Sequence, residues 1–90
     1  MKQYKTIENH ITYDIKEYDN GDKFWYKNEK LHRENGPARD YADGDKFWYK
    51  NGKCHRDGGP AHEYNGNKDY WYNGQYLENI TTDEIGRAHV

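Results

Sequence analysis

The sequence predicts an all-β fold, an antiparallel meander of three to four β-hairpin repeats. One block of sequence occurs twice without a linker, as Tyr18 to Asp40 and Tyr41 to Glu63, and 15 positions are identical. Short aromatic runs within each block alternate with turn dipeptides, a pattern typical of hairpins. A repeat period between about 20 and 50 residues indicates units that cannot bury their apolar faces alone. Each unit must therefore stack on its neighbours.

Composition indicates a small domain whose core is built from aromatic side chains. The chain has 90 residues, a net charge of -2, a mean hydropathy of -1.57, and 3 Trp, 10 Tyr and 2 Phe. Each buried aromatic residue removes roughly 150 to 250 Å² from water, so few are needed. The single cysteine, Cys54, excludes an intrachain disulfide, and we expect a small buried apolar residue because Leu31 occupies its place in the other copy. With no signal peptide or membrane-length apolar run, we expect a cytoplasmic protein without membrane insertion.

Two extended segments and their turns account for each unit. The first segment is the aromatic run Lys23 to Lys27, and the second is Pro37 to Tyr41. The turn Asn51-Gly52 of the second copy is a strong two-residue hairpin signal, since both positions of a type I′ turn need positive φ. Its counterpart Asn28-Glu29 is weaker, because glutamate disfavours that conformation. The other turns of the meander are expected at Asn20-Gly21, Asp43-Gly44 and Asn65-Gly66.

Side-chain alternation predicts aromatic ladders on both faces of the sheet. Phe24 and Tyr26 should point to one face and Trp25 to the other. Residues at the same repeat position lie two strands apart, about 9 to 10 Å. We therefore expect one ladder of Trp25, Trp48 and Trp71, and another of Tyr18, Tyr41 and Tyr64.

The repeat period decays at both ends of the chain. We expect a decayed N-terminal unit at 1–17, repeats at 18–40, 41–63 and 64–78, and a C-terminal cap at 79–90. Residues Ile11 to Tyr18 are interpreted as a strand, although their apolar spacing also fits a helix. For the first ten residues, the sequence does not decide between strand and helix. The spacing of Thr81 and Glu84 is that of a capping box, which predicts a short helix over the last sheet edge.

The repeated unit F-W-Y-K-N-G-K-x-H-R-x-x-G-P-A-x-x-Y-x-D/N-G resembles the MORN repeat, whose period is the same. The resemblance covers Tyr18 to about Tyr76. The chain departs from that family in having Arg33 and Arg56 after histidine, where the family has glycine, and Gly-Pro-Ala where it has G-x-G. The variant W-x-x-N-G-x-x-H-R-x-x-G-P-A looks like that of short proteins of tailed phages and bacteria. The resemblance implies protein–protein contact, membrane-lipid contact or oligomerisation.

The repeated His-Arg pairs are the sharpest candidates for binding. These are His32-Arg33 and His55-Arg56, and an arginine fork suits phosphates or carboxylates. The alternative is structural: the pairs would hydrogen-bond a turn or the neighbouring unit. The exposed part of the aromatic ladders could add a binding surface, because Tyr, Trp and Arg dominate interface energies. The candidate aromatic residues are Trp25, Trp48, Trp71, Tyr26, Tyr49 and Tyr72.

The repeat disfavours catalysis and metal binding. A catalytic centre brings unlike groups to one reacting atom, whereas a translational ladder keeps like groups about 10 Å apart. The five histidines show no close metal-ligand spacing, and the acidic turns lack the spacing of a calcium loop, so we expect no metal and no cofactor.

We expect a non-enzymatic protein-interaction module. If the phage resemblance holds, its role would be that of an accessory protein that inhibits or modulates a host or defence protein. The alternative is binding of a nucleotide or of single-stranded nucleic acid through the arginine and aromatic ladders. Net charge counts against that alternative. Open sheet edges also predict a tendency to form homo-oligomers.

Overall fold

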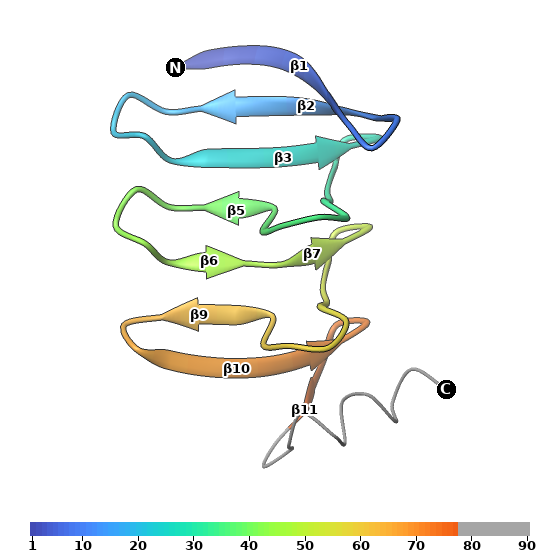
Figure 1. The fold of residues 1–90 in the computed structure, drawn as a ribbon, viewed down its shortest axis with the longest axis vertical. Coiled ribbons are helices and arrows are strands. Elements are labelled where there is room, and N and C mark those ends of the chain that lie inside the picture. The colour runs from blue at the N-terminus through green and yellow to red at the C-terminus, as the bar shows by residue number, and fades with distance from the viewer. Residues whose placement is uncertain (78–90) are drawn as a thin grey trace.

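The computed structural model describes residues 1–77 and shows an all-β protein, so the predicted fold class is confirmed. The C-terminal cap and short helix expected at 79–90 lie outside the described residues. All strand pairs are antiparallel, and the hairpins follow one another down the long axis of the molecule (Figure 1). The strands are β1 (Lys2–Glu8), β2 (Ile11–Glu17), β3 (Lys23–Lys27), β4 (Lys30–Leu31), β5 (Arg39–Asp40), β6 (Lys46–Phe47), β7 (Tyr49–Lys50), β8 (Lys53–Cys54), β9 (His62–Tyr64), β10 (Asn67–Tyr72) and β11 (Gln75–Leu77).

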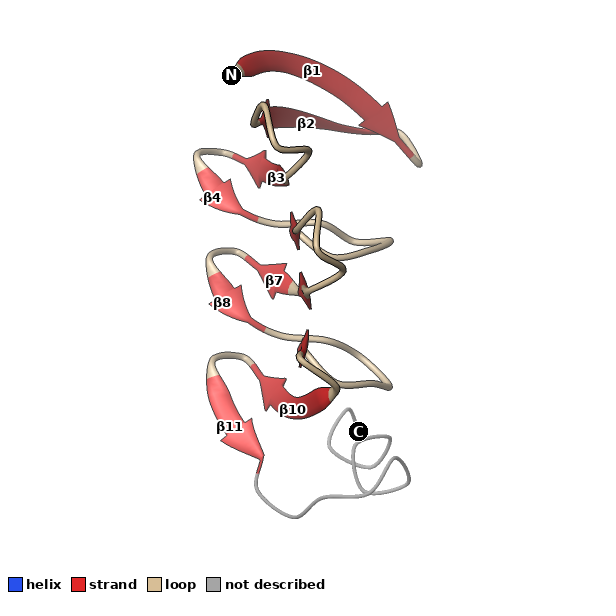
Figure 2. Cartoon of the chain, turned by 90° about the vertical axis from the view of Figure 1, so that its left-hand side faces the viewer, coloured by secondary structure: helices blue, strands red, loops and turns tan. Residues whose placement is uncertain are grey.

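One long sheet carries most of the chain. Its order is β1-β2-β3-β5-β6-β9-β10-β11, with β4 paired to β3, while β7 and β8 pair with each other. The short strands β4, β8 and β11 bend away from the plane of the longer strands and stack along one side of the molecule (Figure 2). Each return segment from such a hairpin then crosses back to start the next unit. The described part of the chain is therefore one long sheet and one two-stranded sheet, with the short strands β4, β8 and β11 stacked along one side.

The N-terminal segment is a strand. β1 pairs with β2 over its whole length, from Lys2↔Glu17 to Glu8↔Ile11. The two strands are joined by a turn in which Asn9 and His10 have φ of 51° and 66°. The open question about the first ten residues is thus settled in favour of β-structure, and the helix interpretation of the apolar spacing is wrong.

The hairpin turns have the left-handed geometry that the sequence predicts. Asn51 and Gly52 have φ of 53° and 80°, as a type I′ turn requires. Asn28 and Glu29 adopt the same conformation, at 52° and 66°. Glu29 therefore carries the cost of a left-handed non-glycine residue, roughly 1 to 2 kcal/mol, which the surrounding stacked units must offset.

The third unit is one residue shorter than the first two, which corrects the expected tryptophan ladder. Its first turn has only Asn65 and Gly66 between paired residues, so the turn Asn73-Gly74 follows Asn51-Gly52 one position earlier than the repeat period predicts. The backbone N–H of Arg56 donates to the carbonyl of Trp71, as that of Arg33 donates to Tyr49. Trp71 thus takes the position of Tyr49. The position of Trp48 is taken by Tyr70.

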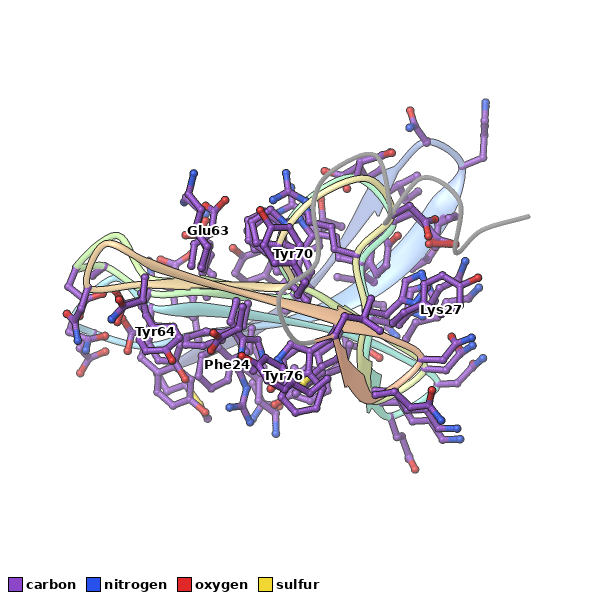
Figure 3. The ribbon with its side chains drawn as sticks, turned by 90° about the horizontal axis from the view of Figure 1, so that it is seen from below. Phe24, Lys27, Glu63, Tyr64, Tyr70 and Tyr76 are labelled. Carbon is purple, nitrogen blue, oxygen red and sulfur yellow. The ribbon has the colours of Figure 1, made fainter. Side chains whose placement is uncertain are left out.

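The sheet has two unlike faces. The core face carries the buried apolar side chains of residues 1–77, which are Tyr13, Ile15, Ala38 and Ala61, together with Trp25, Trp48 and Tyr70. The other side, here called the open face, carries nine aromatic residues, none of them buried. Figure 3 shows Tyr70 and Glu63 on the core face, opposite Phe24, Tyr64 and Tyr76. The open-face aromatics are Tyr18, Phe24, Tyr26, Tyr41, Phe47, Tyr49, Tyr64, Trp71 and Tyr76.

Candidate functional site

The arginines of the His-Arg pairs are packed against the core face. The guanidinium carbon of Arg33 lies 3.6 Å from the centre of the Trp25 ring, and its nitrogens donate to both carboxylate oxygens of Glu8 at 3.1 and 2.8 Å. This pair holds the pKa of the Glu8 carboxyl below its ordinary value, through the hydrogen bonds first. A further nitrogen donates to the carbonyl of Pro37 at 3.3 Å. Arg33 is thus an internal link of the fold.

Arg56 repeats the arrangement more loosely. It lies 3.8 Å from the Trp48 ring and donates to the carbonyl of Pro60 at 3.1 Å and to Glu63 at 3.3 Å. The glycine three residues after each arginine makes room for the guanidinium. A Cβ at Gly59 would lie 3.0 Å from the guanidinium carbon, and one at Gly36 would lie 2.8 Å from that of Arg33. The motif H-R-x-x-G therefore encodes an arginine held between a tryptophan and a glycine.

The histidines join each unit to the next. Nδ1 of His32 accepts a hydrogen bond from the backbone N–H of Asn51 at 2.9 Å, and Nδ1 of His55 accepts one from Asn73 at 3.0 Å. Both imidazoles are buried, at 2% and 8% exposure. A backbone N–H can only donate, so each Nδ1 must be unprotonated. Through Nδ1, each of these histidines fastens the following hairpin turn, while Nε2 of His32 lies 3.5 Å from Glu34 and Nε2 of His55 lies 2.8 Å from Asp57.

A groove runs between the return segments of two neighbouring units. Its volume is about 500 Å³, and Trp48 lies among its lining residues. Each cation that lines it already faces a carboxylate: Arg33 with Glu8, Lys46 with Asp40, Lys50 with Glu34, and Arg56 with Glu63. A phosphate entering the groove would have to compete with these pairs, which weakens the alternative of nucleotide capture there.

The open face carries a row of cationic and aromatic residues across the strands. The register pairs Lys16 with Phe24, Phe24 with Arg39, Arg39 with Phe47, and Phe47 with His62. Lys16, Arg39 and His62 are each separated by one full repeat period and so occupy the same position of successive units. We call these five residues the central row. Tyr18, Tyr41 and Tyr64 flank this row near the first turn of each unit. Tyr26, Tyr49 and Trp71 flank it on the other side.

Two cations of the central row have no acidic partner within residues 1–77. The amine of Lys16 lies 5.0 Å from the centre of the Tyr26 ring. The guanidinium carbon of Arg39 lies 5.3 Å from the Phe24 ring and 5.4 Å from the Tyr49 ring, and its buried Nε has no hydrogen-bond partner. Arg33 and Arg56, by contrast, each pair with a carboxylate. Among the described arginines, Arg39 is therefore the one whose charge no carboxylate of residues 1–77 balances, which makes it the candidate for binding a carboxylate or a phosphate.

His62 occupies the same repeat position as Lys16 and Arg39 and contacts Cys54. Its Nε2 lies 3.2 Å from the sulfur of Cys54, and burial lowers the pKa of the imidazole. Burial, and next the neighbouring thiol of Cys54, raise the pKa of Tyr49 to about 12. Cys54 itself is half-buried, not buried as expected from the matching Leu31. The thiol therefore takes part in a polar contact and is more than a small apolar side chain.

The acidic turns organise the edge of the sheet. Asp22 accepts a hydrogen bond from the backbone N–H of Ala42 at 2.8 Å, and Asp45 accepts one from Asn65 at 3.4 Å. Each carboxylate thus ties its own turn to the next. Among residues 1–77, no group of three or more His, Cys, Asp or Glu side chains is placed to hold a metal ion.

The structure separates the ten sequence-predicted candidates into three groups. His32, Arg33, His55, Arg56, Trp25 and Trp48 form the interlocked core face. Tyr26, Tyr49 and Trp71 lie on the open face beside the central row, and Tyr72 lies 4.6 Å from the His55 ring. Sequence reasoning missed Lys16, Arg39 and His62, because it compared identical positions. Aligning I-K-E-Y, A-R-D-Y and A-H-E-Y would have revealed the row.

Comparison with protein-family models, curated proteins and solved structures finds no match to this chain. The part of the chain that the structure describes contains no helix long and apolar enough to cross a membrane.

Proposed function

We propose that this protein is a non-enzymatic protein-interaction module that binds its partner on the open face of a MORN-like repeat sheet. The observation that carries the proposal is the set of aromatic residues on the open face. The buried apolar side chains of residues 1–77 lie on the core face, whereas nine aromatic residues of the open face keep contact with solvent. A large aromatic surface outside the core is the usual composition of a binding hot spot.

The rings of the open face already form an ordered surface. Tyr18, Phe24, Tyr41, Phe47 and Tyr64 form successive pairs with ring centres 5.2, 5.5, 5.5 and 6.1 Å apart. Most of these pairs are edge-to-face, the arrangement that aromatic rings favour. Rings that are fixed before binding lose little conformational entropy on contact, so the same area gives higher affinity.

The chemistry of the other conspicuous groups supports binding over catalysis. The histidines and arginines shared by both units are engaged in fastening the units together, and Cys54 contacts His62 in a polar cluster with Tyr49. The resemblance to phage proteins favours an accessory role in the cytoplasm, in which the module inhibits or modulates a host or defence protein. Self-association through the outer edge of β1 is a further expectation.

A matched pair of tyrosine variants tests the use of the open face. Tyr41→Ala removes a ring in the middle of that face, and Tyr70→Ala removes one from the core face. Full-length protein and both variants serve as bait in a lysate of the source cells, with and without nuclease, and captured proteins are identified by mass spectrometry. We expect a nuclease-resistant partner that Tyr41→Ala loses and folded Tyr70→Ala retains. Capture that depends on nucleic acid, or that both variants retain equally, would contradict the proposal.

A further inference from the structure

The distance between the two cations of the central row limits which backbone conformation of a bound segment can reach both. Lys16 and Arg39 lie two strands apart, with Phe24 between them. At about 4.8 Å per strand, the two cations are separated by about 9.6 Å at the backbone. The whole row spans four strand spacings, or about 19 Å, across the strands.

A polyproline II helix has nearly the same period. It has about three residues per turn and rises about 3.1 Å per residue, so residues i and i+3 lie on one side about 9.3 Å apart. A β-strand instead places side chains of one side about 6.6 Å apart, and an α-helix gives about 6 Å for i and i+4. Of these three conformations, the polyproline II segment places neighbouring side chains of one side closest to the spacing of Lys16 and Arg39.

Charge complementarity defines what these side chains must be. Within the described part of the chain, neither Lys16 nor Arg39 has a carboxylate partner, and both are held against aromatic rings. Guanidinium groups bind carboxylates through a bidentate fork. The rings of the open face meanwhile suit the flat apolar surface of proline residues, as in known recognition of such helices.

We propose that the open face binds an acidic segment of a partner protein in the polyproline II conformation, with carboxylates three residues apart held by Lys16 and Arg39. The segment runs along the central row, across the strands, and its intervening residues pack on Phe24 and Phe47. This inference rests on the proposed interaction function and names the partner chemistry for it.

The same face disfavours a nucleic acid strand. Two carboxylates lie beside the row: Asp14, which is 2.8 Å from the amine of Lys5, and Asp69, which accepts a hydrogen bond from Tyr64 at 2.7 Å. A strand with a charge on every nucleotide would meet these carboxylates as well as the two cations. A peptide concentrates its charge at two chosen positions and avoids both.

The test measures binding of labelled nine-residue peptides to the full-length protein by fluorescence anisotropy. The first peptide is proline-rich, with glutamates three residues apart. The second has the same composition with the glutamates adjacent, the third has glutamines in their place, and a thymidine oligonucleotide serves as the nucleic acid probe. We expect the first peptide to bind most tightly, and its affinity to fall as salt rises.

Protein variants locate the site. Loss of a hydrogen bond to a charged group lowers affinity by about tenfold or more, so we expect that effect from Arg39→Gln and a smaller one from Lys16→Gln. Lys53→Gln is the matched control, because Lys53 is exposed, loses the same charge and lies away from the open face. We expect it to change affinity less than twofold. Circular dichroism and melting temperature establish that each variant is folded.

The outcomes separate this inference from the function on which it rests. Equal binding of the adjacent-glutamate peptide would overturn the polyproline II register, and tighter binding of the oligonucleotide would overturn the peptide partner. If no peptide binds while Tyr41→Ala still loses its captured protein, the partner chemistry is wrong and the interaction function stands. Because the peptide comparison uses wild-type protein, it decides the question even where an Arg39 variant fails to fold.

Discussion

Replacing Gly36 by alanine should destabilise the protein only while Arg33 is present. The φ of Gly36 is not in the left-handed region, so alanine is acceptable to the backbone. A Cβ there would lie 2.8 Å from Cζ and 2.9 Å from Nη1 of Arg33, closer than any ordinary contact. The guanidinium must therefore shift from its place between Gly36 and Trp25, which disturbs its contacts with Trp25 and Glu8.

The size of the effect follows from what Arg33 would lose. Its contact with the Trp25 ring contributes about 1 kcal/mol. The two hydrogen bonds to Glu8 contribute about another 1 to 2 kcal/mol, discounted for the 16% and 26% exposure of the two side chains. Alanine in place of glycine recovers about 0.4 to 1 kcal/mol by restricting the unfolded chain. We expect a net loss of about 1 to 2 kcal/mol in the free energy of unfolding.

A double-mutant cycle measured by urea unfolding and tryptophan fluorescence tests this account. In the Arg33→Ala background, the Gly36→Ala change should be neutral or slightly stabilising, because no guanidinium remains to be displaced. The coupling energy should thus be about 2 kcal/mol. Equal costs of Gly36→Ala in both backgrounds would refute the reasoning. Gly59→Ala is an internal comparison and should cost less, since its clash and the Arg56 ion pair are looser.

Three further predictions concern the unit junctions and the response to pH. His32→Phe should cost about 1 to 3 kcal/mol, because it leaves the Asn51 N–H without its acceptor, and hydrogen exchange of that amide should accelerate more than global unfolding explains. Because the pKa of Glu8 is lowered in the folded state, the stability from its pair with Arg33 is present above pH 4.5 and lost as pH falls below it; Glu8→Gln should flatten this part of the stability curve. The folded-state pKa of His62 is also lowered, so the unfolded chain takes up its proton first and stability should fall as pH drops below 6.5; His62→Gln should remove that step, and its persistence would contradict the assignment.

The periodicity of the sequence was enough to predict the sheet and its turns. Identity between the two tandem blocks, Tyr18 to Asp40 and Tyr41 to Glu63, defined the length of a unit, and Asn51-Gly52 identified the hairpin turn that the structure confirms. The same reasoning failed in the third unit, because a shortened turn at Asn65-Gly66 moved every later residue by one position. In a β-sheet, a shift by one residue exchanges the two faces, so Trp71 moved from the expected ladder to the open face.

The side-chain contacts of the His-Arg pairs could not be predicted from spacing alone. Arg33 binds Glu8, which lies 25 residues away in a strand that the sequence left unassigned. The sequence allows both a binding and a structural interpretation of these pairs, and the distances from Arg33 to Trp25 and to the Cβ position of Gly36 favour the structural one. Long-range pairing of this kind depends on the register of β1, which no local pattern specifies.

In this fold, the residues that are identical between units are not the residues proposed to bind a partner, and this has a physical reason. A residue that fastens one unit to the next must be the same in every unit, because every junction has the same geometry; Arg33 and Arg56 illustrate this. A residue that touches a partner has no such constraint, since each unit meets a different part of that partner. The position held by Lys16, Arg39 and His62 varies in charge and size from unit to unit, yet its backbone register is constant. Exchanging Arg39 for histidine, the residue of the next unit, should therefore leave the free energy of unfolding almost unchanged while it weakens binding of the acidic peptide at neutral pH. A loss of stability as large as that of the Gly36→Ala variant would show that this position, too, belongs to the junctions.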